Sequence, residues 1–305
     1  MKNNVKLTPF AIGEIKEDIP YKIPSNIIKT GASNFWDKGI YGDGITIAIL
    51  DTGIDLNHIC LKDRIVGGIN FTTEGFSDNF QDYNGHGTHV AGIIAGNRIE
   101  KGITGIAPKA NLLIIKVLDS KGNGGFDGII KGIEYAIEHD VDIINMSLGG
   151  KCSNEKLHEV IKKATQKGII ICCASGNDGD NCADTDEINF PGNYTEVIEV
   201  GAVDMDDNIA KFSNTNQEID IVSYGVNIMS TYKNNKYATT SGTSQATPHV
   251  SGALALLKEY YIKTYGRKPS EKELWTMLIK YTKSLKGIDT KAQGHGVLYL
   301  GKECD

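Results

Sequence analysis

The sequence predicts an α/β fold in which a mostly parallel sheet is covered by helices on both faces. From about residue 45 onward, short apolar runs alternate with longer helical patterns. Runs that are apolar throughout are typical of parallel strands buried on both faces. Glycine, at 35 of 305 residues, is frequent enough for the many tight turns that join such strands and helices. Together these observations favour a layered α/β domain.

The expected elements follow one another in strand–helix order. The expected strands are residues 45–50, 112–117, 141–146, 169–174 and 197–202. The expected helices are residues 87–96, 126–139, 154–167, 243–261 and 270–283. Asn154 and Ser270 stand at helix starts, where their side chains can accept bonds from free backbone N–H groups. Because ligands in such folds bind beyond the carboxyl ends of the strands, we expect the chemistry there.

The first 30 or so residues differ from the rest of the chain. Pro9, Pro20 and Pro24 interrupt them, and they show no clear strand or helix period. We therefore expect an extended arm at the N-terminus.

Composition narrows the class of protein. The net charge of −6 does not favour a nucleic-acid partner. No apolar run is long enough for a membrane span, and none of signal-peptide length follows Met1, so we expect a cytoplasmic protein. The six cysteines include no metal-binding spacing and are expected as free thiols, with a Cys152–Cys182 bridge as the alternative.

Three distant segments carry the parts of an activated serine nucleophile. Asp51 follows the apolar run 45–50, His86 stands in Gly-His-Gly-Thr-His, and Ser244 stands in Gly-Thr-Ser-Gln-Ala-Thr-Pro. A carboxylate that orients an imidazole, which in turn takes the proton of a hydroxyl, is the required set. Taken singly, the three residues have ordinary explanations as a turn former, a helix-start histidine and an N-cap. Their joint occurrence predicts a catalytic triad.

These motifs and the order Asp, His, Ser resemble the subtilisin family of serine proteases, and most of all the bacterial intracellular subtilisins. The resemblance runs from about residue 5 to residue 300 and includes segments 143–150, 212–222, 249–256 and 294–298. It implies a subtilisin-like three-layer fold. It also implies a serine endopeptidase of broad specificity that forms an acyl-enzyme with protein or peptide substrates and needs no catalytic cofactor. A homodimer is implied by analogy alone.

The resemblance also implies an oxyanion hole. Asn177, in Ala-Ser-Gly-Asn-Asp-Gly, matches the segment that supplies a side-chain amide to the oxyanion. The backbone N–H of Ser244 opens a helix among unsatisfied donors, and Thr243 is placed to help.

A substrate cleft is implied by two further segments. Gly122, Asn123 and Gly124 are expected as an edge strand to which a peptide adds, and Ser147, Leu148 and Gly149 as the opposite wall. Recognition through the peptide backbone predicts loose sequence specificity.

Two pockets should hold substrate side chains. Leu118, Phe126, Ile129 and Leu148 are expected around the fourth residue before the cut, with a plain core as the alternative. The first pocket is expected between Ala174, Ser175, Gly176 and Asn189, with Asp178 at its rim. We predict acceptance of large apolar or aromatic residues there, with some tolerance of basic ones.

The arm matches a regulatory motif of the same relatives. Leu7, Thr8, Pro9 and Phe10 resemble the Leu-Ile-Pro-Tyr/Phe motif of an N-terminal extension that lies across the cleft and is later removed. The resemblance implies that residues 1–18 are an inhibitory pro-segment and residues 19–305 the catalytic domain. A disordered tail is the alternative.

Structural calcium is usual in subtilisins, but this sequence departs from the pattern. Cys60 and Ile99 stand where the tight site should have oxygen ligands, and both are poor ligands for a hard cation. A weaker site is expected from Asp204 with the carbonyl groups of Gly192, Tyr194 and Val197. Loop 178–187 is a further candidate, with a solvated loop as the alternative.

Other departures leave the role open to specialisation. Gln245 replaces a common methionine after the serine, Thr247 replaces a small residue, and Ser223-Tyr224 replaces Ala-Pro. One alternative function is a dedicated protease that trims a leader peptide. Another is a non-catalytic peptide-binding pseudoprotease, against which the intact Asp51, His86, Ser244 and Asn177 argue.

Overall fold

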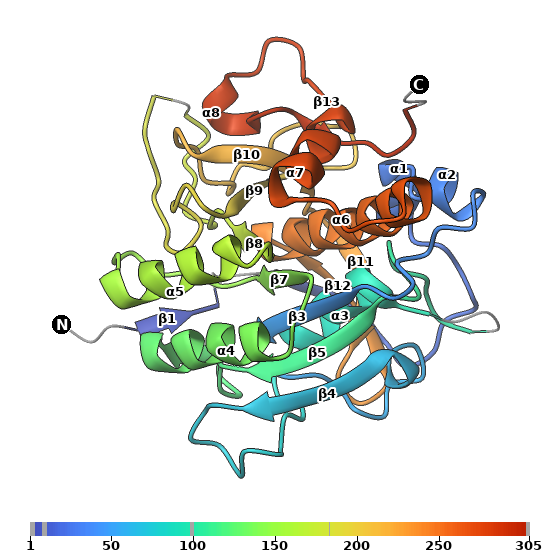
Figure 1. The fold of residues 1–305 in the computed structure, drawn as a ribbon, viewed down its shortest axis with the longest axis vertical. Coiled ribbons are helices and arrows are strands. Elements are labelled where there is room, and N and C mark those ends of the chain that lie inside the picture. The colour runs from blue at the N-terminus through green and yellow to red at the C-terminus, as the bar shows by residue number, and fades with distance from the viewer. Residues whose placement is uncertain (1–3, 8–10, 98–100, 183, 303–305) are drawn as a thin grey trace.

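The computed structural model describes residues 4–7, 11–97, 101–182 and 184–302. Within these residues the main sheet has nine strands in the order β13-β14-β10-β9-β8-β7-β3-β5-β4, and the run from β14 to β4 is parallel. Figure 1 shows it from β10 at the top to β4 at the bottom. The strands are β3 Thr46–Asp51, β4 Ile65–Asn70, β5 Asn111–Lys116, β7 Ile143–Met146, β8 Ile170–Ala174, β9 Ile198–Val203, β10 Ile219–Tyr224, β13 Thr282–Lys283 and β14 Val297–Leu298.

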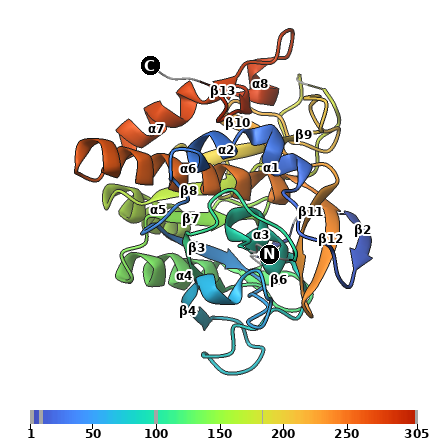
Figure 2. The ribbon, with the colours of Figure 1, turned by 90° about the vertical axis from the view of Figure 1, so that its right-hand side faces the viewer.

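Helices cover both faces of this sheet. Those of the layers are α3 His86–Ala95, α4 Phe126–Glu138, α5 Glu155–Gln166, α6 Thr243–Tyr265 and α7 Glu271–Lys280. Helices α3 and α6 pack together, as do α4 and α5, and Figure 2 shows α4 and α5 across the sheet from α3. Shorter helices are α1 Ser25–Thr30, α2 Ser33–Trp36, α8 Thr290–Gln293 and the 3₁₀ turn Lys62–Arg64.

Strand β3 shows why the central strands of the sheet are mostly apolar. Ile47 and Ile49 belong to the hydrophobic core on the α3/α6 side, whereas Ala48 and Leu50 belong to the core on the α4/α5 side. Successive side chains of a strand point to opposite faces of the sheet. A strand that is covered by helices on both faces therefore has few positions exposed to solvent. The predicted fold class is confirmed.

The predicted strands and helices are all present, with ends that differ by a few residues. Asn154 accepts a bond from the N–H of Leu157, and Ser270 forms a capping box with Glu273, as predicted. Strands β4 and β10 and the hairpin of β11 Ile228–Tyr232 and β12 Lys236–Ser241 were not predicted.

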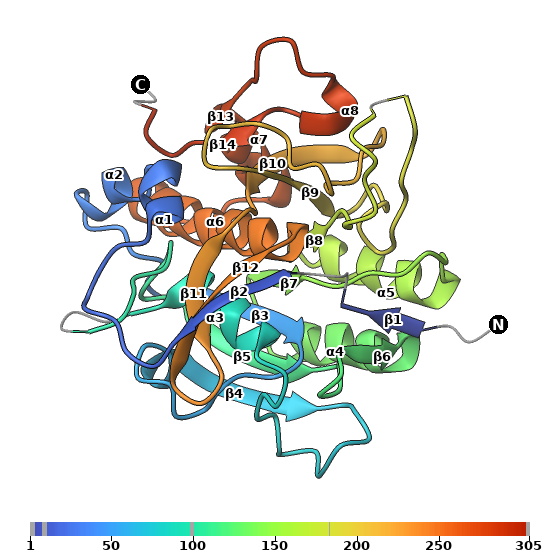
Figure 3. The ribbon, with the colours of Figure 1, turned by 180° about the vertical axis from the view of Figure 1, so that it is seen from behind.

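The N-terminal arm is extended but not unstructured. Strand β1 (Asn4–Lys6) pairs with β6 (Asn123–Gly125), and β2 (Ala11–Lys16) pairs with β12, both antiparallel. Figure 3 shows β1 beside β6, and β2 at the β12 side of the β11–β12 hairpin. The expectation of an arm without periodic structure is therefore corrected: two strands form on edges supplied by the rest of the chain, and α1 follows them.

Two sequence expectations concern cysteines and membranes. Cys152, Cys172, Cys173 and Cys182 are free thiols, so the Cys152–Cys182 bridge is not formed. Cys304 lies outside the described residues. No described helix is long and apolar enough to cross a membrane.

Candidate active site

Asp51 and His86 form a buried pair. Asp51 ends β3 and His86 begins α3; the imidazole Nδ1 lies 2.9 and 3.0 Å from the two carboxylate oxygens. Both side chains are fully buried. Because Nδ1 faces the carboxylate, it carries the proton of this contact and the ring turns Nε2 away from Asp51.

Ser244 lies in the first turn of α6, which packs beside α3. Its Oγ donates to the carbonyl of Ser147 at 3.1 Å, and the Ser147 hydroxyl donates to the carbonyl of Ser244 at 2.9 Å. Ser147 follows β7, just as Asp51 ends β3, so the predicted residues meet at the carboxyl edge of the sheet. This is the edge at which ligands bind in such folds.

Asn177 is oriented by the start of α6. Its Oδ1 accepts the backbone N–H and the hydroxyl of Thr243, each at 2.9 Å. With the oxygen fixed in this way, the amide nitrogen and its two N–H donors point away from Thr243. Thr243, predicted as an oxyanion donor, therefore directs both of its donors to Asn177 and serves to orient the amide.

A buried carboxylate that the sequence did not single out ties the Asp51 and His86 segments together. Asp82 is 2 % exposed. Its Oδ1 accepts the Thr52 hydroxyl at 2.9 Å and the Gly85 N–H at 2.8 Å, and its Oδ2 accepts the Thr88 N–H and hydroxyl at 2.9 and 2.6 Å. Thr52 follows Asp51, and Gly85 and Thr88 flank His86. Asp82 thus fixes the position of α3 relative to the end of β3.

Thr52 is held from two further sides. Its hydroxyl accepts the Gly87 N–H at 3.0 Å, and its carbonyl accepts the buried ammonium of Lys116 at 2.7 Å. A Cβ on Gly87 would overlap the Gly53 carbonyl oxygen, so α3 approaches the β3 end this closely only with glycine there. In the sequence, the only trace of this hydrogen-bond network is the position of Asp82, four residues before His86.

Two other histidines, His89 and His249, are fully buried and neutral. Burial lowers the pKa of His89 to about 3 and that of His249 to about 4. His89 bonds to the carbonyl groups of Ile228 and Ala238 at 3.1 Å, which holds the hairpin against α3. Their burial and backbone contacts indicate a structural role for both.

The two predicted cleft walls enclose β1. Val5 pairs with Gly124 in β6, and Leu7 donates to the Gly122 carbonyl at 2.8 Å. On the other side Lys6 and Gly149 exchange backbone bonds of 3.1 and 3.2 Å. An extended segment of the chain therefore lies where a peptide was predicted to bind. Thr8, Pro9 and Phe10 lie outside the described residues.

Val5 lies in the region predicted to hold the fourth substrate residue before the cut. Its side chain is fully buried and belongs to the hydrophobic cluster of the α4/α5 face. That cluster includes the four residues predicted to line the pocket, Leu118, Phe126, Ile129 and Leu148. They are therefore both core and contact surface for a residue in the arm.

The predicted first pocket has polar walls. Gly176 has φ +113°, and a Cβ there would overlap the Asn189 amide, so only glycine fits. The Asn189 amide donates to Asp178 at 3.1 Å, and Lys151 pairs with the same carboxylate oxygen at 2.7 Å. Burial opposes ionisation of Asp178, but these two bonds hold its pKa below the usual value.

Some of the residues expected to hold calcium take part in local turns. Asp204 accepts the N–H groups of Asp206 and Asn208 at 2.8 and 3.0 Å within its own turn, and the Tyr194 carbonyl accepts the Val197 N–H at 3.1 Å. Cys60 is buried with its Sγ 3.5 Å from the Tyr237 hydroxyl, and Ile99 lies outside the described residues. No cluster of three or more His, Cys, Asp or Glu suited to a metal occurs in the described part of the chain.

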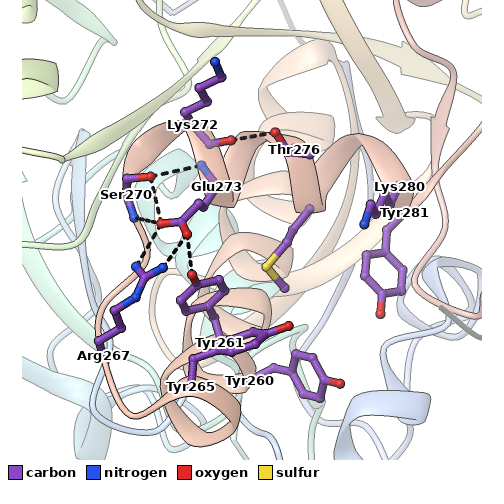
Figure 4. A pocket seen from close by; sticks show the side chains of 11 residues that line it. Tyr260, Tyr261, Tyr265, Arg267, Ser270, Lys272, Glu273, Thr276, Lys280 and Tyr281 are labelled. Carbon is purple, nitrogen blue, oxygen red and sulfur yellow. Dashed lines mark hydrogen bonds and ion pairs between the residues drawn. The ribbon is translucent and has the colours of Figure 1, made fainter. Parts of the chain in front are cut away.

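A groove of about 630 Å³ lies at the far end of α6. Tyr260, Tyr261 and Tyr265 line it together with residues of α7 (Figure 4), and the Glu273 carboxylate accepts bonds from Tyr261 and Arg267 at its edge. Tyr261 is about 25 Å along the helix from Ser244 at 1.5 Å per residue. This groove lies between α6 and α7 and is separate from Asp51, His86 and Ser244.

Comparisons with known proteins agree with this geometry. The family model described as "Subtilase family" matches residues 42–296. An intracellular serine protease of Paenibacillus polymyxa is 48 % identical over 302 residues, covering 98 % of this chain and 92 % of the relative. The major intracellular serine protease of Bacillus subtilis (strain 168) is 47 % identical over 303 residues, covering 98 % and 94 %. Subtilisin DY of Bacillus licheniformis is 42 % identical over 245 residues, covering 80 % and 86 %.

Proposed function

Since this chain belongs to the subtilase family and is a subtilisin-like serine endopeptidase, we propose that Asp51, His86 and Ser244 are its catalytic triad. The buried contact of His86 with both Asp51 oxygens is the observation that carries this assignment. His86 Nε2 takes the Ser244 proton as Oγ attacks the substrate carbonyl, and Asp51 stabilises the imidazolium that forms. The proton then passes to the leaving amine, and water hydrolyses the acyl-enzyme. Subtilases need no cofactor for this chemistry.

Asn177 is proposed as the side-chain donor to the oxyanion. Its Oδ1 is held by Thr243, which leaves the amide N–H groups for the negative oxygen of the tetrahedral intermediate. The Ser244 backbone N–H, in the first turn of α6, is the second proposed donor.

The acyl half of the substrate is proposed to lie between Gly122–Gly124 and Ser147–Gly149. The pairing of β1 with both walls supports this, because the arm shows that an extended chain fits there. Backbone recognition gives broad specificity, with large apolar or aromatic residues preferred in the first pocket and some basic ones tolerated beside Asp178. A strong preference for acidic residues in peptide kinetics would overturn this specificity.

Residues 1–18 are proposed as an inhibitory pro-segment, and residues 19–305 as the catalytic domain. The support is that β1 fills the cleft with a buried Val5 and backbone bonds to both walls. A substrate cannot pair with β6 while β1 does. Full activity therefore requires that the arm be removed or displaced.

Two further proposals concern location and assembly. Two of the relatives are named intracellular serine proteases, so we propose that this chain acts in the cytoplasm. A homodimer is proposed only by analogy with intracellular subtilisins.

The test is hydrolysis of an Ala-Ala-Pro-Phe chromogenic peptide by three preparations. These are the full-length protein, the protein without residues 1–18, and the latter with Ser244→Ala. We expect weak, strong and no activity, respectively. Equal activity in the first two would refute the inhibitory arm. Failure of a serine-directed phosphonate to label Ser244 would refute the triad, whereas labelling with hydrolysis of only a few peptides would favour a dedicated leader-processing protease.

A further inference from the structure

A buried glutamate lies behind the walls of the proposed first pocket. Glu199 is in β9, next to Val200, which pairs with Ala174 of β8. A Cβ on Gly192 would lie 3.1 Å from Glu199 Oε1. The same Cβ would lie 2.9 Å from the carbonyl oxygen of Ala174 and 3.4 Å from that of Asn189. Since Ala174 and Asn189 are proposed walls of the pocket, the glycine leaves space where both walls meet the Glu199 carboxyl group.

The carboxyl group of Glu199 is only half satisfied. The side chain is fully buried. Its Oε1 accepts the Asn216 amide at 3.3 Å, whereas Oε2 has no hydrogen-bond partner among the residues that the structure describes. A buried polar atom without a partner is unfavourable and rare in folded proteins. The unpartnered oxygen therefore points to a ligand that supplies a donor.

The surroundings of Glu199 favour a cation as that ligand. Burial raises the pKa of Glu199 well above its ordinary value, and the nearby Asp220 and Glu218 add to the shift. The Asp220 carboxylate accepts the backbone N–H of Glu199 at 2.8 Å, and burial raises the pKa of Asp220 to about 7. Within the described part of the chain, none of these three carboxyl groups forms an ion pair. A positive group that reached Glu199 would be attracted by all three and would lower its pKa.

The carboxylate at the rim of the pocket is already paired. Asp178 lies 2.7 Å from the Lys151 ammonium and accepts the Asn189 amide at 3.1 Å. Its side chain is also 41 % exposed. An exposed carboxylate with a cation beside it attracts a second cation only weakly. Of the two carboxyl groups at the pocket, Glu199 is therefore the stronger candidate for recognising a positive charge.

We propose that Glu199 is the specificity-determining residue at the base of the first pocket, where its carboxylate pairs with the cationic end of a lysine or arginine placed before the cut. The inference rests on the proposed function, because it needs a substrate whose acyl half lies beside Ala174 and Asn189. The proton of Glu199 passes to solvent when the cation binds. An aromatic side chain can fill the same pocket without a bond to Glu199, so basic residues become a second preferred class.

The first test compares substrates in pairs. The full-length protein is trimmed by limited proteolysis after folding, and two peptides compete in one solution, so the ratio of their kcat/KM values does not depend on the active fraction. The chromogenic peptides end in Ala-Ala-Pro-Arg, Ala-Ala-Pro-citrulline or Ala-Ala-Pro-Phe; citrulline keeps the length of arginine without its charge. We expect the wild type to prefer arginine over citrulline about tenfold or more. Glu199→Gln should lower this ratio about tenfold and leave kcat/KM for the phenylalanine peptide nearly unchanged.

Two matched variants locate the effect. Glu259 is also buried, but it accepts the backbone N–H groups of Tyr41–Asp43 and lies about 22 Å along α6 from Ser244 at 1.5 Å per residue. Glu259→Gln should leave the arginine-to-citrulline ratio unchanged. Asp178→Asn should lower it by no more than about twofold, because that carboxylate is exposed and already paired. Circular dichroism unfolding verifies the fold of every variant.

A small cation gives a measurement that needs no cleavage after arginine. Benzamidine should inhibit hydrolysis of the phenylalanine peptide competitively. Glu199→Gln should raise its inhibition constant about tenfold, because the amidinium loses its charged partner. Neutral benzamide, which has nearly the same shape, should inhibit the wild type and the variant equally.

The outcomes separate the two proposals. An arginine-to-citrulline ratio near one in the wild type, or the same ratio and benzamidine constant in Glu199→Gln, would overturn the inference and leave an active protease in which Glu199 is structural. A loss carried by Asp178→Asn alone would overturn it as well. No hydrolysis of any peptide by the folded, trimmed wild type would overturn the proposed function and this inference with it.

Discussion

At the residue scale, the site is a set of side chains whose orientation is fixed by others. Asp51 holds His86, and Thr243 holds Asn177. The sequence singles out the proposed triad and Asn177 because each stands in a distinctive local motif. Asp82 could not, since its partners Thr52 and Thr88 come near it only when β3 and α3 pack. A side chain that acts through long-range hydrogen bonds leaves little trace in local sequence.

Asn177→Ala is expected to lower kcat of the trimmed enzyme about 10²–10³-fold, the loss measured for such a donor in subtilisin, with KM little changed. The amide meets the oxyanion and not the ground-state peptide. Steady-state kinetics on the chromogenic peptide measure both values. A comparable rise in KM with unchanged kcat would show that Asn177 binds substrate only.

Asp82→Asn is expected to lower kcat about 10- to 100-fold with an unchanged KM. An amide nitrogen would face the Thr88 N–H, and a small displacement of His86 has a large effect on proton transfer. Asp142→Asn is the matched control. Asp142 is also buried and accepts the Thr46 N–H at 2.9 Å, but it lies just before β7, at the opposite edge of the sheet. Loss of kcat in both variants alike would indicate general destabilisation instead.

Glu199→Gln is expected to stabilise the protein increasingly as pH rises. Burial, with Asp220 and Glu218 adding to it, raises the pKa of Glu199 well above its ordinary value of 4.5. Above that pH the unfolded carboxyl loses its proton while the folded one keeps it, so the wild-type free energy of unfolding falls. As long as the pH stays below the folded-state pKa, the difference between variant and wild type should grow with pH, by up to about 1.4 kcal/mol per pH unit. Urea unfolding at pH 5, 6 and 7 measures it, and a constant difference would contradict the shift.

At the element scale, strands that are buried on both faces could be predicted from the sequence. Edge strands, which pair with only one neighbouring strand and are partly exposed, could not. β3, β7 and β8 are mostly apolar because each lies between two hydrophobic cores. The edge strand β4 includes Gly67 and Gly68 and is only partly buried. Neither face of β2 is buried in the core, so its sequence does not alternate between apolar and polar residues as that of a half-buried strand does. Its structure arises from the exposed edge of β12.

Val5→Asp should activate the full-length protein. Val5 is the fully buried anchor of β1, and a carboxylate in that apolar cluster would weaken the docking of the arm by about 2 kcal/mol or more. Peptide hydrolysis without proteolytic trimming should rise about tenfold or more. Lys6→Gln, at an exposed neighbouring position of β1, is the control and should have little effect. Unchanged activity of Val5→Asp would mean that β1 does not limit access to the cleft.

At the scale of the whole molecule, two hydrophobic cores share one sheet, so they should unfold together. Ile47 faces the α3/α6 core and Ile171 the α4/α5 core, and both are almost fully buried. Ile47→Ala and Ile171→Ala should each lower the free energy of unfolding by about 2–5 kcal/mol. Trp36 and Trp275 both pack against the α3/α6 core, so tryptophan fluorescence reports that side while circular dichroism reports the whole chain. The two transitions should coincide in both variants if unfolding is cooperative. A circular dichroism transition in Ile171→Ala that precedes the fluorescence change would instead show that the α4/α5 side unfolds on its own. In that case β6, the proposed substrate-binding edge beside α4, could lose its structure while the proposed catalytic residues remain in place.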